Sequence, residues 1–302
     1  MFPPFPRTSR FLIVPLFAVL TGSLPTVCRA QETGPITKGL RVFTCAHSFH
    51  GFVYGMLAEA AKNAGIEGHT PAGYSGIGGS RVIQHWTLED EKHQAKVALS
   101  SGKVDVLTLS PIWMPDEGIE KFAKLGFEHN PNIRITVQEF WLPNDTYEPK
   151  YPLDVHKMPK VDHDATNVAE LRKKQSQYDH DVDEYVRGIN DRLGKQVLFT
   201  VPVGQAAVAL REKIVAGQVP GLKKQWDLFG DPWGHAKPPL QVLATYCHFA
   251  VIYRRSPVGL PLPAALKNAK KPEWDDKLNR LLEELAWEAV VHHPMSGVTA
   301  GK

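Results

Sequence analysis

The sequence predicts an α/β fold, a doubly wound parallel sheet with helices on both faces. Strand-like runs alternate with helix-like runs along the chain, which is the pattern of a parallel sheet with crossover helices. The first strand-like run is short and rich in β-branched and aromatic residues, as expected for a strand buried on both faces. In addition, chemically distinctive side chains follow several of these runs, at the sheet edge where open α/β folds bind ligands.

Each element is predicted from the spacing of its apolar residues and from the turn-forming residues at its ends. Strands are expected in the first half of 41–51 and at 66–72, 104–109, 133–139 and 197–201. Helices are expected at 52–63, 81–86, 89–101, 116–125, 166–193, 205–216, 239–253 and 275–291. The region at about 141–190 is expected to be an insertion, and its proline-rich first part, 141–164, is expected to lie over the site.

The N-terminal segment has the pattern of a secretory signal peptide. Arg7 and Arg10 precede an apolar run at 11–20, and small residues precede a cleavage point after Ala30. The apolar run is too short to span a membrane, and no other span is expected. We therefore expect a signal peptide at 1–30, a secreted or periplasmic protein, and a single domain over 31–302.

The charge balance excludes one class of partner. Removing the three arginines of the signal segment from the 35 basic residues leaves 32, equal to the 32 acidic residues. A nucleic-acid or anionic-membrane binder needs a net basic surface, so neither is expected. The remaining cysteines, Cys45 and Cys247, are too few for a disulfide framework and are expected to be buried free thiols.

Ser48 is the first candidate for chemistry. It stands where the first strand ends and a helix begins, so its hydroxyl lies at the ligand-binding edge of the sheet. Its own N–H and the first helical N–H groups would favour an anion there. We interpret Ser48 as a nucleophile, and the alternative is a helix N-cap, which is the commoner role of such a serine.

A base and an acid come late in the chain, close together on one loop. Asp231 can fix the tautomer of His235, and the far ring nitrogen can then take the proton of Ser48. The developing oxyanion needs donors, for which the N–H of Ser48 and the glycine-rich loop at 73–80 are candidates.

These residues resemble the motif blocks of the SGNH (GDSL-like) hydrolases, a superfamily of serine esterases and lipases. Ala46-His47-Ser48 stands where the family has its Gly-Asp-Ser-type turn, and Asp231 and His235 stand where it pairs an acid with a histidine before the last helix. The resemblance implies a flavodoxin-like three-layer α/β/α sandwich with a five-stranded, mainly parallel sheet. It also implies that Gly76, or next Gly78, donates to the oxyanion.

The chain departs from the family pattern at three points. Asp231 and His235 are separated by three residues rather than two. No asparagine follows the third strand, so either the oxyanion hole lacks that donor or Ser110 or Asn144 replaces it. His47 occupies the position of the family's acidic residue and is expected to contact substrate rather than to act in catalysis.

The resemblance implies an exported serine esterase that cleaves acyl or acetyl esters on a small molecule or a glycan, carbohydrate esters above all. No cofactor and no metal are expected. Besides the triad and the oxyanion donors, four side chains are expected to bind substrate: His47, His85, Trp113 and Trp233.

Two alternatives remain open at this stage. Three imidazoles near one edge, those of His47, His50 and His85, could bind zinc and activate water without a serine. The fold could instead be a non-catalytic glycan-binding module whose tryptophans stack on sugars. The tryptophans in question are Trp86, Trp113, Trp141 and Trp233.

Overall fold

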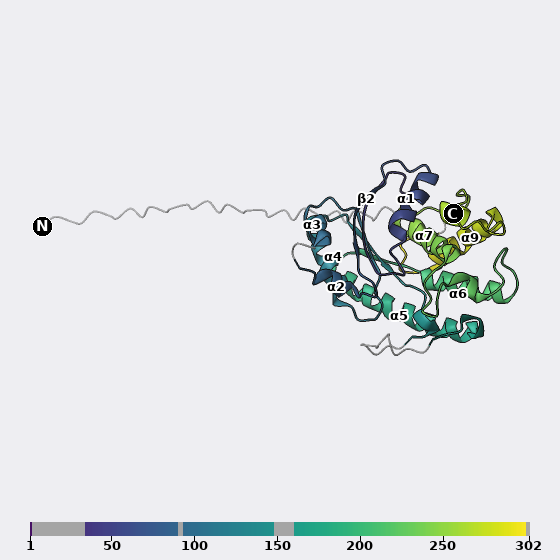
Figure 1. Cartoon of the computed structure of the whole chain (residues 1–302). Helices are drawn as coiled ribbons and strands as arrows, with labels where there is room; N and C mark the ends of the chain where they lie inside the picture. Colours follow the sequence, from purple (N-terminus) through teal and green to yellow (C-terminus); the bar gives the residue numbers. More distant parts are fainter. Residues whose placement is uncertain (2–33, 90–92, 148–159, 300–302) are drawn as a thin grey trace. The chain divides into compact units, whose positions relative to one another are not determined.

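The structure is a computed structural model that describes Met1 and residues 34–89, 93–147 and 160–299 (Figure 1). The expected signal peptide at 1–30 lies outside the described residues, apart from Met1, and so do residues 148–159 of the expected loop over the site. In the described part of the chain, no helix combines the length and the apolar character needed to cross a membrane.

The described residues form one five-stranded sheet in which every neighbouring pair of strands is parallel. Its order is β2-β1-β3-β4-β5, the flavodoxin-like order. The strands are β1 (Arg41–Ala46), β2 (Thr70–Gly76), β3 (Val106–Leu109), β4 (Arg134–Gln138) and β5 (Leu198–Val201). The predicted fold class is therefore confirmed, and β1 lies inside the sheet with its carboxyl end between those of β2 and β3.

Helices cover both faces of this sheet. The first half of the chain supplies α1 (Val53–Asn63), α2 (Val82–Trp86), α3 (Gln94–Ser100) and α4 (Glu117–His129). The second half supplies α5 (Val168–Leu193), α6 (Val203–Val215), α7 (Pro238–Tyr253), α8 (Ala264–Asn268) and α9 (Asp276–His292). The helices α1, α6, α7 and α9 pack together on one side, and α2, α3 and α4 pack together on the other (Figure 1). The result is a three-layer α/β/α sandwich.

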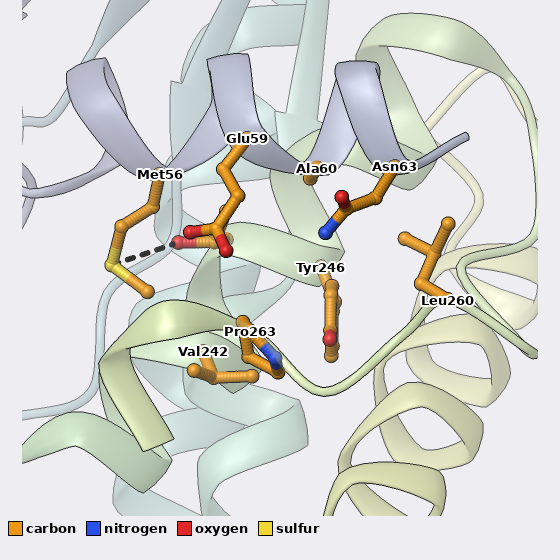
Figure 2. A pocket seen from close by; sticks show the side chains of 9 residues that line it. Met56, Glu59, Ala60, Asn63, Val242, Tyr246, Leu260 and Pro263 are labelled. Carbon is orange, nitrogen blue, oxygen red and sulfur yellow. Dashed lines mark hydrogen bonds between the residues drawn. The ribbon is translucent and has the colours of Figure 1, made fainter. Parts of the chain in front are cut away.

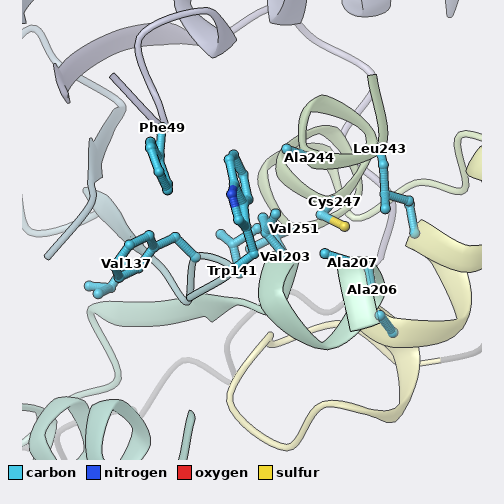
Figure 3. Packing of buried hydrophobic residues seen from close by; sticks show 14 of the residues in the cluster. Phe49, Val137, Trp141, Val203, Ala206, Ala207, Leu243, Ala244, Cys247 and Val251 are labelled. Atoms are coloured by element: carbon cyan, nitrogen blue, oxygen red, sulfur yellow. The ribbon is translucent and has the colours of Figure 1, made fainter. Parts of the chain in front are cut away.

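Two aromatic side chains at the carboxyl edge of the sheet belong to the hydrophobic core. Figure 3 shows Phe49 and Trp141, from the segments after β1 and β4, beside apolar residues of α6 and α7. Helix α7 is buried along nearly its whole length, which explains its uniformly apolar sequence. Cys247 on α7 and Cys45 on β1 are both buried and unpaired, as expected.

The second strand is displaced from its prediction. It was expected at 66–72, whereas β2 runs from Thr70 to Gly76. Its sequence, Thr-Pro-Ala-Gly-Tyr-Ser-Gly, has the composition of a turn, and it is extended because it pairs with β1 along its length. This displacement brings Gly76 level with Ala46 at the end of β1.

The connection from β4 to β5 contains the expected irregular stretch. Helix α5 makes the crossover that a parallel sheet requires. Before it, the chain forms only two short 3₁₀ turns among its described residues, at Pro143–Asp145 and His163–Ala165.

Candidate active site

Ser48 lies in a tight turn at the end of β1, with its residue exposed to solvent. The N–H groups of His50 and Gly51 donate to the carbonyl oxygen of His47, and the N–H of Phe49 donates to the His47 ring. The N–H of Ser48 donates to no group among the described residues, so it is free to bind a ligand oxygen.

Ser48 is not a helix cap. Helix α1 begins at Val53 with Phe52 as its N-cap residue, and no side chain caps it. The N-cap alternative is therefore wrong. The expectation that the first helical N–H groups lie beside Ser48 is also wrong, because a further turn separates Ser48 from α1.

The three triad residues meet as predicted. His235 Nε2 lies 2.9 Å from Ser48 Oγ, and His235 Nδ1 lies 2.6 Å from Asp231 Oδ2. The side chains of His235 and Asp231 are 44% and 36% exposed, so a substrate can reach the imidazole. An alcohol, an imidazole and a carboxylate in this order form a proton relay.

The loop that carries Asp231 closes on its own carboxylate. Asp231 Oδ1 accepts from the backbone N–H groups of Trp233, Gly234 and His235, at 3.0–3.2 Å. Burial raises the pKa of Asp231, but the hydrogen bonds from the backbone and ring of His235 outweigh it, so the net pKa lies below its ordinary value. The extra residue between acid and base fits because Gly234 has a φ of +95°, which glycine adopts without strain.

Two aromatic rings fix the imidazole in place. The Phe49 ring stacks on Trp141, with centroids 4.9 Å apart, and meets the His235 ring edge-on at 5.0 Å. The indole N–H of Trp141 donates to the carbonyl oxygen of Gly234 at 2.8 Å. Segments after β1 and β4 are thereby joined to the Asp231 loop.

Asn144 is a strong candidate for the missing oxyanion donor. Its backbone N–H donates to the carbonyl oxygen of Trp233, which holds it against the Asp231 loop. Its φ of +51° is left-handed, a conformation that asparagine tolerates better than most residues. The side chain is 4% exposed, yet its amide nitrogen donates to no partner in the described structure. A buried donor without an acceptor requires an explanation, and a ligand oxygen would supply one.

The glycines after β2 lie at the same edge of the sheet. Gly76 pairs with Ala46, and the N–H of Ile77 donates to Ala46, which leaves the Gly76 N–H outside the ladder. A Cβ at Gly76 would come within 2.5 Å of the Tyr74 ring, so a larger residue there would require the exposed Tyr74 side chain to move. Gly78 has open space around it. Their role as oxyanion donors stays a prediction.

His47 does not contact substrate, and that expectation is wrong. It is 4% exposed, and both ring nitrogens are engaged. Nδ1 accepts from the Phe49 N–H, so Nε2 carries the proton and donates to Ser110 Oγ at 2.8 Å. Burial, followed by nearby His85 and His235, lowers the pKa of His47 to about 3, so the ring is neutral. The hydrogen bond from His47 to Ser110 joins the Ser48 turn to the segment after β3. Ser110, the other candidate oxyanion donor, is therefore already hydrogen-bonded to His47.

His85 is likewise an interior residue rather than a substrate contact. It is 3% exposed, and its ring nitrogens lie 2.8 Å from Ser75 Oγ and 2.9 Å from Ser80 Oγ. Burial lowers its pKa to about 4. It therefore holds the ends of the glycine-rich loop together. Trp113 and Trp233 are half-buried, and the backbone of Trp233 belongs to the Asp231 loop.

The zinc alternative is contradicted. Among the described residues, His47, His50 and His85 do not form a group with metal-ligand spacing. His50 stacks instead on His248, and its ring nitrogens have no hydrogen-bond partner in the described structure. Trp141 cannot stack on a sugar as the glycan-binding alternative requires, because it is 3% exposed and packs in the core.

A buried ionic cluster contacts the Asp231 loop through its backbone. Sequence reasoning did not predict this cluster. Asp145 accepts two hydrogen bonds from Arg211, at 2.5 and 2.9 Å, and one from Thr166. His163 Nδ1 lies 2.9 Å from Asp145, and His163 Nε2 donates to the carbonyl oxygen of Asp231 at 3.1 Å. These residues are far apart in sequence, and no motif signals that they meet.

Replacing Asp145 by alanine should lower the free energy of unfolding by about 3–5 kcal/mol, because Arg211 is left as a buried unpaired charge. Burial opposes ionisation of Asp145, but Arg211 and His163 outweigh it and hold its pKa below the ordinary value. Its contribution should be present above the unfolded pKa of about 4 and be lost as pH falls toward the folded pKa.

Urea unfolding of the wild type and of Asp145→Ala between pH 7 and pH 3 measures both effects. Glu212→Gln is the matched control, since it breaks the half-exposed Arg172 pair and should cost about 1 kcal/mol or less. Equal losses in the two variants, or a difference that does not shrink in acid, would contradict this assignment.

Comparison with known proteins identifies no family. No family model matches the chain, and no curated protein matches it. Among solved structures, the fold is similar to that of a DUF4886 family protein from Bacteroides uniformis, with a TM-score of 0.51 and 13% identity over 84% of this chain and 95% of that chain. A second structure, the polysaccharide biosynthesis enzyme WcbI, gives a TM-score of 0.34 and 14% identity over 71% of this chain and 70% of that chain, which is too low to support an argument. The first likeness concerns the fold alone.

Proposed function

We propose that this protein is an exported serine esterase of the SGNH type. The observation that carries the proposal is the relay of Ser48, His235 and Asp231, with contacts of 2.9 and 2.6 Å. The exposure of Ser48, the hydrogen-bonded Asp231 loop and the unused amide of Asn144 support it further.

In the proposed reaction, Ser48 Oγ attacks the ester carbonyl carbon while His235 Nε2 takes its proton. Asp231 holds the imidazole and stabilises the imidazolium. The oxyanion accepts from the Ser48 N–H and the Asn144 amide, with Gly76 or Gly78 as a third donor. The imidazolium then protonates the leaving alcohol, and water activated by the same imidazole releases the acyl group.

The substrate class rests on the resemblance noted in the sequence. It implies acyl or acetyl esters, with a carbohydrate as the leaving alcohol. Trp113 and Trp233 are half-buried and are the tryptophans proposed to contact it.

The small hollow between α1 and α7 is unsuited to such a substrate. It is lined by Met56, Glu59, Tyr246 and neighbouring residues (Figure 2) and has a volume of about 10 Å³. A space of this size holds at most about one water molecule. The proposed substrate site is the exposed rim around Ser48, because the three triad side chains meet there.

A fluorophosphonate probe should label the wild type, because the relay activates Ser48, and Ser48→Ala should abolish labelling. Hydrolysis of 4-nitrophenyl acetate by that variant should fall by about 10⁴-fold. Ser101→Ala, which changes an exposed serine away from the site, should behave as wild type. Mass spectrometry of the adduct and initial rates measure the two effects.

The outcomes separate the function classes. Hydrolysis that survives in Ser48→Ala and is lost to a chelator would indicate a metallohydrolase. A wild type that is neither labelled nor active, but binds a glycan, would indicate a binding module. Either result overturns the proposal.

Asn144→Ala should lower kcat by about 10²–10³-fold and change KM little, because an oxyanion donor acts mainly in the transition state. Asn132→Ala removes an exposed asparagine and serves as the control. Steady-state kinetics on 4-nitrophenyl acetate give both constants. A variant that only raises KM would show that Asn144 binds substrate instead.

A further inference from the structure

A second polar cluster lies at the carboxyl edge of the sheet, beside β4 and β5 rather than β1. Glu139 directly follows β4, Asp183 is on α5, and His293 directly follows α9. All three are buried, and one potential ligand atom from each lies within 4.8 Å of the other two. Segments far apart in sequence therefore place two carboxylates and an imidazole around one point.

Glu139 lies beside another carboxylate and forms no ion pair with a lysine or arginine among the described residues. It is fully buried, and neither carboxylate oxygen accepts a hydrogen bond in the described structure. In the described part of the chain, no lysine or arginine forms an ion pair with Glu139 or Asp183. A buried carboxylate without compensation is costly, so this arrangement suggests a missing ligand.

The spacing of the three side chains fits a metal ion better than hydrogen bonds. His293 Nε2 lies 3.2 Å from Glu139 Oε2 and 3.5 Å from Asp183 Oδ2, and neither contact has hydrogen-bond geometry. Tetrahedral zinc with bonds of about 2.0–2.2 Å separates neighbouring ligand atoms by roughly 3.3–3.6 Å. The observed separations are close to that range.

A second layer of contacts orients these groups. Thr200 Oγ1 lies 3.1 Å from His293 Nδ1 and donates to Asp183 Oδ1 at 3.1 Å. If Nδ1 carries the imidazole proton and donates to Thr200, the lone pair of Nε2 faces both carboxylates, as metal-bound histidines require. The Met295 N–H also lies 3.4 Å from Nδ1, and this longer contact is given up in that tautomer.

A pocket of about 270 Å³ gives access to the cluster from solvent. Asp183 and His293 line it, as do Asp179, one helical turn earlier on α5, and Arg172. Arg172 is occupied by Glu212, with contacts of 2.5 and 2.6 Å, and does not neutralise the cluster. An ion can therefore enter, and a fourth ligand position faces the pocket.

We propose that Glu139, Asp183 and His293 bind one divalent transition-metal cation, for which Zn²⁺ fits best. Mixed carboxylate and imidazole ligands suit Zn²⁺ or Mn²⁺, whereas Ca²⁺ and Mg²⁺ prefer oxygen ligands alone. Two carboxylates, a neutral imidazole and a divalent cation also sum to zero charge. The site departs from the sequence expectation of no metal, and it is independent of the proposed esterase activity.

The cation would join the end of β4, helix α5 and the segment after α9. That segment otherwise contacts β5 through the Thr200 N–H, which donates to the Met295 carbonyl oxygen. Because binding is confined to the folded state, it should stabilise the fold by an amount that grows with the logarithm of the cation concentration.

The test uses purified protein stripped with a chelator and dialysed. Adding Zn²⁺ should give about one bound equivalent by elemental analysis, and at a hundredfold excess over Kd should raise Tm by about 5 °C. Mn²⁺ should act more weakly and Ca²⁺ should have no effect. Glu139→Gln and Asp183→Asn should remove both binding and the shift.

Two controls distinguish loss of the cation site from misfolding of the variant protein. Glu139→Gln keeps the size and shape of the side chain, so its metal-free Tm should stay near the wild-type value. Glu184→Gln alters an exposed carboxylate on the same helix and should keep the full Zn²⁺ response. Failure of the wild type to bind Zn²⁺ and Mn²⁺, or a shift that persists in Glu139→Gln, would overturn the proposal.

Discussion

The hydrogen bonds of the Asp231 carboxylate to its own loop are the constraint on which the candidate site depends. One oxygen accepts from the N–H groups of residues 233–235, and the other faces the ring of His235. The acid therefore shapes the loop, stays ionised and fixes the tautomer of the base in one arrangement. Without these bonds the loop that carries the half-exposed imidazole would lose the hydrogen bonds that shape it, and the imidazole would keep only its contact with Phe49.

The rest of the edge holds this loop against the sheet. Phe49 packs on His235 and Trp141, Trp141 donates to Gly234, and His163 donates to the carbonyl oxygen of Asp231. Each contact joins the loop to a different segment, so the relay is assembled only in the folded protein. The same segment after β4 begins with Glu139 and ends with Asn144, and it thus connects the proposed cation site to the proposed oxyanion donor.

Local pattern was enough to predict the sheet and the triad. Four of the five described strands are rich in apolar or β-branched residues, and the strand-to-helix turn at Ser48 together with the late acid and histidine indicated one edge of a parallel sheet. Features set by tertiary contact were not predictable. β2 has a turn-like composition and is a strand only because β1 pairs with it. His47 and His85 look like site residues in the sequence, but serine hydroxyls satisfy them in the interior. The Asp145 cluster depends on residues whose proximity no spacing reveals.

A crystal structure of the protein after reaction with a 4-nitrophenyl alkylphosphonate tests the central claim most directly. The account predicts phosphorus bonded to Ser48 Oγ and a phosphonyl oxygen about 2.7–3.1 Å from both the Ser48 nitrogen and Asn144 Nδ2. The His235–Asp231 contact should persist in that adduct. Phosphorus on another residue, or an adduct whose oxygen faces solvent while His235 has moved away, would contradict it.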